Sequence, residues 1–337
     1  MKFIFLVAML CSFAIPGGAV AETATLKGVG QYAIPDWFKS SFLDLSEEAA
    51  AAGASGKHLL MYFGQEGCPY CAELFNNNFS QKHIVDYTRA HFESIDINLW
   101  GDREVTDFNG RRLTEKEFAA AHKVWFTPTI LFFDEHGKQV LRINGYYPPH
   151  RFLHALQYLG DKREGGMNFS QYLATLSPAP AAGVLHAESF FVPQPHDLRK
   201  LKDKPIAVFF EQKDCSGCDA LHKNIFPQPA TREQLKRFHV LQLDRWSDTP
   251  LVTLQGEKTT ARKWAERLNI AYVPTAVLFD RGKEVIRIEA LLKAFHVQSV
   301  LDYAASGAYR TQPNLQRFIR ARAEGLLEHG VAVDLWE

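Results

Sequence analysis

The sequence lacks an excess of charge of either sign, because its 337 residues contain 38 Lys and Arg against 38 Asp and Glu. A chain without a basic field gives no argument for nucleic acid as a partner. The sequence also lacks a comfortable membrane span, because the apolar run at residues 3–13 falls short of the roughly 20 residues that a bilayer requires. We therefore expect no nucleic-acid partner and no stable membrane insertion.

The first 21 residues have the pattern of a secretion signal. Lys2 supplies the positive end, residues 3–13 are apolar, and Ala19-Val20-Ala21 gives the small-x-small cleavage pattern before Glu22. The alternative, a retained membrane anchor, would need a longer apolar run. We expect residues 1–21 to be removed and the mature protein to be periplasmic or secreted.

Cysteine is scarce, with five in the whole chain, and Cys11 lies within the predicted signal. The other four form two CxxC pairs, Cys68 with Cys71 and Cys215 with Cys218, in a compartment that would be oxidising. Zinc ribbons space their pairs by roughly 15–20 residues, whereas 143 residues lie between these two. A purely structural disulfide would gain little here, because the CxxC loop is so short. The pairs therefore indicate redox chemistry.

The surroundings of the first pair recur around the second. Apolar runs at residues 57–63 and 204–210 are each typical of a buried strand, and each leads into a CxxC pair. Such matching at a constant shift indicates a tandem duplication. At shifts of 146 or 147 positions the matched residues are Cys68 and Cys215, Trp100 and Trp246, Gly110 and Gly256, and Pro128 and Pro274.

The pattern along the first unit predicts an α/β domain. A capping box of Thr114 and Glu117 opens one helix, and Asn109-Gly110 is a strong hairpin signal. Helices are expected after Pro35 and at residues 71–79, 80–91, 114–122 and 149–159, and strands at 57–63, 92–98, 129–133 and 139–144. We expect two such domains, each a central mixed β-sheet flanked by helices, with a hairpin insert before the penultimate helix.

The domain boundaries follow from the repeat. The first domain is expected at residues 22–176 and contains the CPYC pair, while the second is expected at 196–337 and contains the CSGC pair and a trailing helix. Between them, residues 177–195 are rich in Pro and Ala, which is typical of a semi-extended linker that does not pack as a core.

A CxxC pair at a helix N-terminus implies different roles for its two cysteines. The free N–H groups and the positive end of the helix dipole favour a thiolate at the first cysteine. Cys68 and Cys215 are therefore the expected nucleophiles. Cys71 and Cys218, three residues on, lie on the same helical face and can resolve a mixed disulfide.

The two pairs differ in their intervening and neighbouring residues. Ser216-Gly217 stands where the first pair has Pro69-Tyr70, and a glycine loosens a helical turn. Glu66 opposes a thiolate at the first pair, while Lys213 supports one at the second and Asp214 opposes it. The two sites should differ in reduction potential, although these residues leave the sign open.

The order strand, CxxC, helix, Pro, β-hairpin and helix resembles the thioredoxin superfamily, twice over. The segments Pro35-Asp36-Trp37-Phe38, residues 62–71 (YFGQEGCPYC) and Phe126-Thr127-Pro128-Thr129 are similar to secreted SoxW-like thioredoxins of bacteria. The resemblance covers nearly all of residues 22–176 and, more faintly, 196–323.

The resemblance implies a substrate-binding role for the proline that precedes the β-hairpin in each unit. Pro128 and Pro274 are expected to be cis and to lie beside the sulfurs. The residues before them, Thr127 and Val273, offer backbone groups that can pair with an extended substrate. Tyr70, between the cysteines, is expected to be exposed and to contact substrate.

One departure from the family concerns the acid that thioredoxins bury six positions before the first cysteine. Tyr62 and Phe209 stand at those positions, so proton transfer at the second cysteine needs water, another residue or Tyr62 itself. His222 is expected to be a surface or satisfied core histidine rather than a base.

The sequence thus predicts an exported thiol-disulfide oxidoreductase without cofactor or metal, since the electrons reside in the sulfurs. Its expected partners are protein thiols or disulfides in the exported compartment and an unidentified redox donor or acceptor. A thioredoxin-like reductant is favoured. A DsbA-like oxidant, an isomerase, and a binding or metal-delivery module with an inactive second domain are the alternatives.

Overall fold

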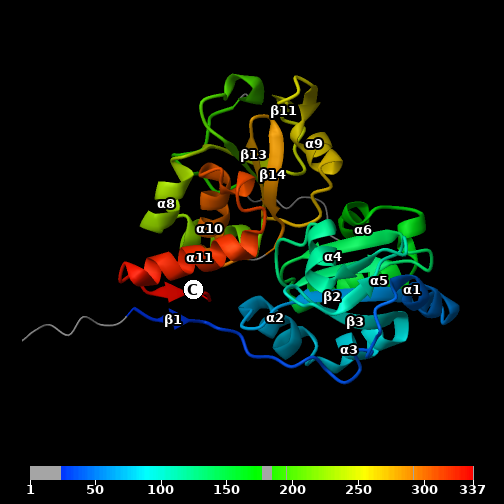
Figure 1. The fold of residues 1–337 in the computed structure, drawn as a ribbon. Coiled ribbons are helices and arrows are strands. Elements are labelled where there is room, and N and C mark those ends of the chain that lie inside the picture. The colour runs from blue at the N-terminus through cyan, green and yellow to red at the C-terminus, as the bar shows by residue number, and fades with distance from the viewer. Residues whose placement is uncertain (1–23, 177–183, 195, 291, 337) are drawn as a thin grey trace, which may run out of the picture.

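The computed structural model describes residues 24–176, 184–194, 196–290 and 292–336. The predicted secretion signal lies outside these ranges. Figure 1 shows two α/β domains that follow one another along the chain. In the described ranges, none of the helices combines the length and the apolar character that crossing a membrane would require.

The first domain is built on a four-stranded sheet of order β3-β2-β6-β7. Strand β3 is parallel to β2, whereas β6 is antiparallel to both β2 and β7. The strands are β2 (His58–Gly64), β3 (Phe92–Asn98), β6 (Thr129–Phe133) and β7 (Gln139–Asn144). The helices are α1 (Leu45–Ala54), α2 (Pro69–Glu73), α3 (Lys82–His91), α4 (Glu115–Ala121), α5 (Pro149–Gly160) and α6 (Phe169–Leu176).

The second domain repeats this topology with a sheet of order β10-β9-β13-β14. Its strands are β9 (Ile206–Glu211), β10 (His239–Asp244), β13 (Thr275–Asp280) and β14 (Lys283–Ile288). Its helices are α7 (Ser216–Ala220), α8 (Pro229–Leu235), α9 (Ala261–Arg267), α10 (Ala294–Ala305) and α11 (Leu315–Glu328). A separate three-stranded sheet of order β12-β11-β8 is formed by β8 (His196–Asp197), β11 (Pro250–Val252) and β12 (Lys258–Thr260). The mixed sheets flanked by helices confirm the expected fold.

Both central strands are buried on both faces, as their continuous apolar runs predict. Every residue of β2 and of β9 is buried. In β2, Leu60 and Tyr62 join one apolar cluster, while Met61 and Phe63 join the cluster on the opposite face. The strand end that carries the cysteines is thus held by packing on two sides.

The hairpin insert forms as predicted. Strands β4 (Glu104–Thr106) and β5 (Arg112–Thr114) pair antiparallel around Asn109-Gly110, and Gly110 takes the left-handed φ of +75°. Thr114 and Glu117 make both hydrogen bonds of the capping box at the start of α4. The sequence was sufficient to predict the hairpin and the capping box, because each depends on interactions within a few residues.

The expected linker differs from the structure in its second half. Residues 177–183 and Pro195 lie outside the described ranges, but Phe190 and Phe191 pack against the apolar core of the second domain, each within 6.3 Å of the Phe226 ring. The expectation that this segment does not pack is therefore wrong for these residues, because two adjacent aromatic side chains gain more by burial than by exposure. The domain boundaries themselves stay a prediction.

The two ends of the described chain meet. Strand β1 (Leu26–Lys27) pairs in parallel with β15 (Val333–Asp334), which follows α11. Just after β1, Gly30 bridges to Gly67, and a Cβ at Gly30 would lie 2.2 Å from the Cys68 carbonyl oxygen. In Figure 1 the C-terminal end lies beside β1 and below α11. The N-terminal segment thus joins the second domain to the first cysteine pair.

Candidate active site

The first cysteine pair lies where β2 gives way to α2. Cys68 is the N-cap of α2, and its Sγ accepts a hydrogen bond of 3.1 Å from the Cys71 N–H. The two cysteines are joined as a disulfide. Pro69 follows at the first helical position, where a missing N–H has no cost. The sulfur of Cys68 is therefore placed at the positive end of the helix, as the spacing predicts.

The second pair has the same geometry. Cys215 is the N-cap of α7, its Sγ accepts a hydrogen bond of 3.0 Å from the Cys218 N–H, and the two form a disulfide. Just before Cys215, Asp214 takes a left-handed φ of +50°, and the matching residue Gly67 takes +74°. Asp is among the few non-glycine residues that tolerate this conformation. The second domain therefore keeps the same turn although Asp replaces Gly at this position.

The two predicted prolines are both cis, at Thr127-Pro128 and Val273-Pro274. The Thr127 carbonyl oxygen lies 3.4 Å from Cys68 Sγ. In the second domain a Cβ at Gly217 would lie 2.9 Å from Pro274 Cδ, so glycine leaves the space that the proline ring fills. Both prolines thus lie beside their cysteine pairs as expected. Their role in holding substrate stays a prediction, as does that of Val273.

Tyr70 is not exposed, which corrects the expectation from its position between the cysteines. Its side chain is only 3% exposed, because the second domain covers it. The Tyr70 hydroxyl accepts a hydrogen bond of 2.7 Å from the Lys293 N–H and lies 3.3 Å from His296 Nδ1. The ring also packs against His296 and Trp336, with centroids 5.0 and 5.2 Å away. Burial lowers the pKa of His296, so its neutral ring can accept a hydrogen bond from the Tyr70 hydroxyl.

A groove of about 890 Å³ opens beside the first pair, between the two domains. Cys68 and Thr127 lie on one wall, and side chains of α11 form the other. Trp100, which matches Trp246 across the repeat, also lines it and donates from Nε1 to Gln65 Oε1 at 2.6 Å. The tryptophan therefore both anchors the insert and faces the groove.

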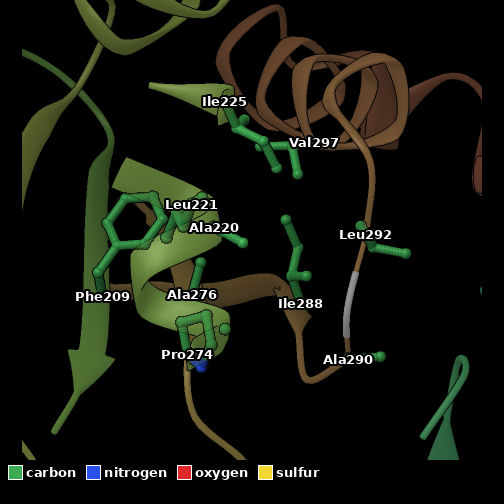
Figure 2. A pocket seen from close by; sticks show the side chains of 11 residues that line it. Phe209, Ala220, Leu221, Ile225, Pro274, Ala276, Ile288, Ala290, Leu292 and Val297 are labelled. Atoms are coloured by element: carbon green, nitrogen blue, oxygen red, sulfur yellow. The ribbon is translucent and has the colours of Figure 1, made fainter. Parts of the chain in front are cut away.

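The residue after the first cysteine is more exposed in the second pair. Ser216 is exposed, whereas its counterpart Pro69 is buried. Figure 2 shows an apolar pocket beside Pro274, lined from the strand side by Phe209 and from the helix side by Leu221, with a volume of about 40 Å³. Leu292 lines both this pocket and the groove beside Cys68. The two cysteine pairs therefore border on a common loop but differ in the exposure of the residues between the cysteines.

In the first domain Tyr62 stands at the position where the family has an acid, and it pairs with Tyr32. The Tyr62 hydroxyl donates to the Tyr32 hydroxyl at 3.0 Å, and the latter donates to the Gln65 carbonyl oxygen at 2.9 Å. Burial raises the pKa of Tyr62, so its phenol stays protonated and is no proton acceptor. Gly64 makes room for this hydroxyl, since a Cβ there would lie 2.0 Å from it.

The second domain has Phe209 in place of Tyr62 and carries buried charged groups on the same strand and on the helix that follows. Glu211, which matches Gly64, is fully buried, and both its carboxylate oxygens lie 3.1 Å from His222 Nε2. Glu188 contacts His222 Nδ1 at 3.1 Å and accepts from Arg232 at 2.9 Å. Sequence reasoning missed Glu211, although a charged residue at the end of the apolar run 204–210 was a usable signal.

His222 is a satisfied core histidine, as expected, with a carboxylate beside each ring nitrogen. Burial alone would lower the pKa of His222, but the hydrogen bonds and charges of Glu211 and Glu188 outweigh it and raise the pKa. His222 lies one helical turn after Cys218, and His186 stacks on it with centroids 4.5 Å apart. Within the described ranges, no three His, Cys, Asp or Glu side chains converge as a metal-binding group.

Comparison with known proteins agrees with this geometry. The model of the thioredoxin-like domain matches residues 45–160 and again 197–305, together more than half of the chain. No curated protein matches. Among solved structures, a thioredoxin-fold protein from Helicobacter pylori is 29% identical over 36% of this chain and 79% of that one, with a TM-score of 0.31.

Two further solved structures are similar in the same way. A thioredoxin from Thermus thermophilus is 25% identical, over 36% of this chain and 88% of its own, with a TM-score of 0.30. A DsbH oxidoreductase is 16% identical, over 40% of this chain and 93% of its own, with a TM-score of 0.28. With the family model matched twice and a CxxC pair in each match, the chain belongs to the thioredoxin-like domain family and is a thiol-disulfide oxidoreductase.

Proposed function

We propose that this protein is an exported reductant that passes electrons from its CxxC pairs to disulfides of protein partners. The proposal for export rests on the signal pattern at residues 1–21. The proposal for protein partners rests on the groove beside Cys68, which is large enough for more than a single small thiol.

The setting of Cys68 carries the proposed direction. Its side chain is 3% exposed, and burial disfavours a thiolate. Glu66, two residues earlier, adds a negative charge, and among the described residues no Lys, Arg or charged His donates a hydrogen bond to the sulfur. A strong oxidant needs its reduced state stabilised. With the N-terminus of α2 as the main support for its thiolate, the reduced pair should give up electrons readily.

The proposed reaction balances within the four sulfurs involved. The Cys68 thiolate attacks one sulfur of a partner disulfide, which forms a mixed disulfide and releases the other partner sulfur as a thiolate. Cys71 then loses its proton to water and attacks Cys68 Sγ. The Cys68–Cys71 bond forms, the bond to the partner breaks, and the departing thiolate takes up a proton. Two electrons have passed to the partner.

The reduction potential of each pair tests the direction. We expect the CPYC pair, isolated by Cys215→Ser with Cys218→Ser, to equilibrate against glutathione with a potential near the roughly −270 mV of thioredoxin. The CSGC pair is measured in the matched variant with Cys68→Ser and Cys71→Ser. A CPYC value near the roughly −120 mV of DsbA would overturn the proposal in favour of an oxidant.

Export has its own test. The protein expressed with its full sequence in a Gram-negative host is expected in the periplasmic fraction, with a mature N-terminus at Glu22 by intact mass. A full-length chain retained in the cytoplasm would contradict the assignment, while leaving the redox proposal intact.

A further inference from the structure

The groove beside Cys68 has walls from two different domains. Cys68 and Thr127 belong to the first domain, whereas Ile319 and Ala323 belong to α11 of the second. A volume of about 890 Å³ lies within the range of specific ligand sites, roughly 300–1,000 Å³. In Figure 1, α11 lies on the part of the second domain that is nearest to α2. The second domain therefore contributes to the surroundings of the reacting sulfur.

Side-chain hydrogen bonds fix the two walls relative to each other. Gln65 Nε2 donates to Thr127 Oγ1 at 3.1 Å and to Gln316 Oε1 of α11 at 2.9 Å. Gln316 Nε2 in turn donates to the Trp125 carbonyl oxygen at 2.9 Å. Tyr70 adds its hydrogen bond to Lys293. A groove held in this way is formed before a partner arrives, which lowers the entropic cost of binding.

The second domain covers the helix side of Cys68, and this restricts the shape of a partner that can reach the sulfur. Pro69 and Tyr70, which flank Cys68 on the helix side, are both buried. A folded surface cannot reach the sulfur from that side, so a partner must enter along the groove. A single extended segment fits this restriction, because its backbone can pair with groups beside the cysteine while its alternate side chains face the two walls.

The charges of the α11 wall restrict the partner further. Arg317 is exposed, stacks 5.4 Å from the centroid of the Trp100 ring, and makes no ion pair among the described residues. The other two cations that line the groove, Lys116 and Arg320, are already paired, with Asp102 and Glu324.

Glu66 lies on the opposite wall, and within the described ranges it too makes no ion pair. A partner's acidic side chain is therefore directed to the α11 wall, where Arg317 can pair with it. Beside Arg317 the same helix offers apolar surface from Ile319, and Phe295 of α10 adds to this surface.

We propose that the second domain completes the substrate groove of the CPYC site, and that this groove takes an extended polypeptide segment with an acidic residue beside its cysteine and an apolar residue against α11. The inference depends on the proposed function only in requiring that the partner presents a cysteine sulfur to Cys68. It applies in either direction of electron flow.

Charge selection is tested with two peptides that differ only in Asp or Lys beside a cysteine held as a mixed disulfide. The protein is the reduced variant with Cys215→Ser and Cys218→Ser, and the readout is the rate of peptide release. We expect the Asp peptide to react about fivefold faster, the size of one partly screened ion pair. Arg317→Glu should reverse this preference. Arg112→Glu, on the exposed hairpin outside the groove, makes the same charge change and should not.

The role of the α11 wall is tested by placing a bulky side chain in the groove beside it. Ala323→Trp projects an indole into the groove and should slow both peptides by about tenfold or more, as expected when a bulky group displaces a bound segment. Hydroxyethyl disulfide, which is small, should react at an unchanged rate. Because Ala323 is 7% exposed, Arg320→Trp on the exposed part of the same wall provides a second variant that does not depend on the core.

The outcomes separate this inference from the proposed function. Equal rates for the two peptides, unchanged by Arg317→Glu, together with normal peptide release in both tryptophan variants, would overturn the groove proposal. If neither the peptides nor hydroxyethyl disulfide react with the reduced protein, the redox function at Cys68 itself fails. A preference for the Lys peptide would also contradict the proposed partner.

Discussion

Cys71→Ser, in a chain that also has Cys215→Ser and Cys218→Ser, is expected to accumulate as a covalent complex with its partner through Cys68. The N–H of residue 71 can still donate to Cys68 Sγ, so the nucleophile keeps its support, but the resolving sulfur is gone. An intramolecular thiol acts at an effective concentration far above that of external thiols, so turnover should fall at least ~100-fold. Non-reducing electrophoresis with mass spectrometry identifies the complex.

The control for this result is Cys68→Ser with Cys71→Ser in the same background. This variant should capture nothing, because a hydroxyl does not form a mixed disulfide. If capture persists in the control, the complex is not formed through Cys68. If the Cys71→Ser variant itself turns over at the native rate, the assigned roles of the two cysteines are wrong.

His222→Phe is expected to lower the free energy of unfolding by about 3–5 kcal/mol, because it leaves the buried Glu211 carboxylate with the neutral Gln242 amide but without the histidine that can carry the opposite charge. Water cannot replace the lost contact, because the Glu211 side chain is fully buried. Phe is the residue that the first domain has at the matched position, Phe75, so the ring itself fits a thioredoxin-like core. Urea unfolding monitored by fluorescence gives the value.

The double variant Glu211→Leu with His222→Phe should recover much of this loss, because an apolar pair of similar volume replaces a buried ion pair at little cost. The difference from additivity isolates the interaction. An exposed pair serves as the matched control: Asp248→Asn, which removes the partner of Arg262, should change stability by less than about 1 kcal/mol. A loss at His222 no larger than this control would contradict the buried network.

The same network predicts a pH dependence with a definite sign. The pKa of His222 is raised in the folded protein, so the folded state binds its proton more tightly than the unfolded state does. This contribution is fully present below the ordinary histidine pKa of about 6.5 and is lost as the pH rises through the folded value. His222→Phe should therefore flatten the fall in stability above that pH, and an unchanged slope would contradict the raised pKa of His222.

Much of the fold followed from local signals. The capping box at Thr114, the hairpin at Asn109-Gly110 and the apolar run of β2 each act over a few residues, and each forms as predicted. The duplication added evidence that neither half gives alone, since a matched Pro in two units is hard to explain as a chance turn. Both prolines are cis and lie beside the cysteine pairs.

The expectations that differed from the structure concern contacts between distant parts of the chain. Tyr70 was expected at the surface because the tip of a CxxC turn is exposed in an isolated domain. It is covered by residues 223 or more positions away along the chain. Phe190 and Phe191 stand in a Pro- and Ala-rich segment, where composition favours an extended linker, but a neighbouring core accepts them.

The sequence by itself determined the chemistry of this protein: two cysteine pairs at helix N-termini, each matched to a proline, in a repeated α/β unit. These features are encoded by spacing and local propensity, which one chain displays directly. Only the tertiary structure decided that the second domain covers Tyr70 and forms one wall of the groove beside Cys68, and that Glu211 and His222 form a buried pair. Such contacts depend on how separate surfaces pack, and packing joins residues such as Gln65 and Gln316, 251 positions apart, that no local pattern links.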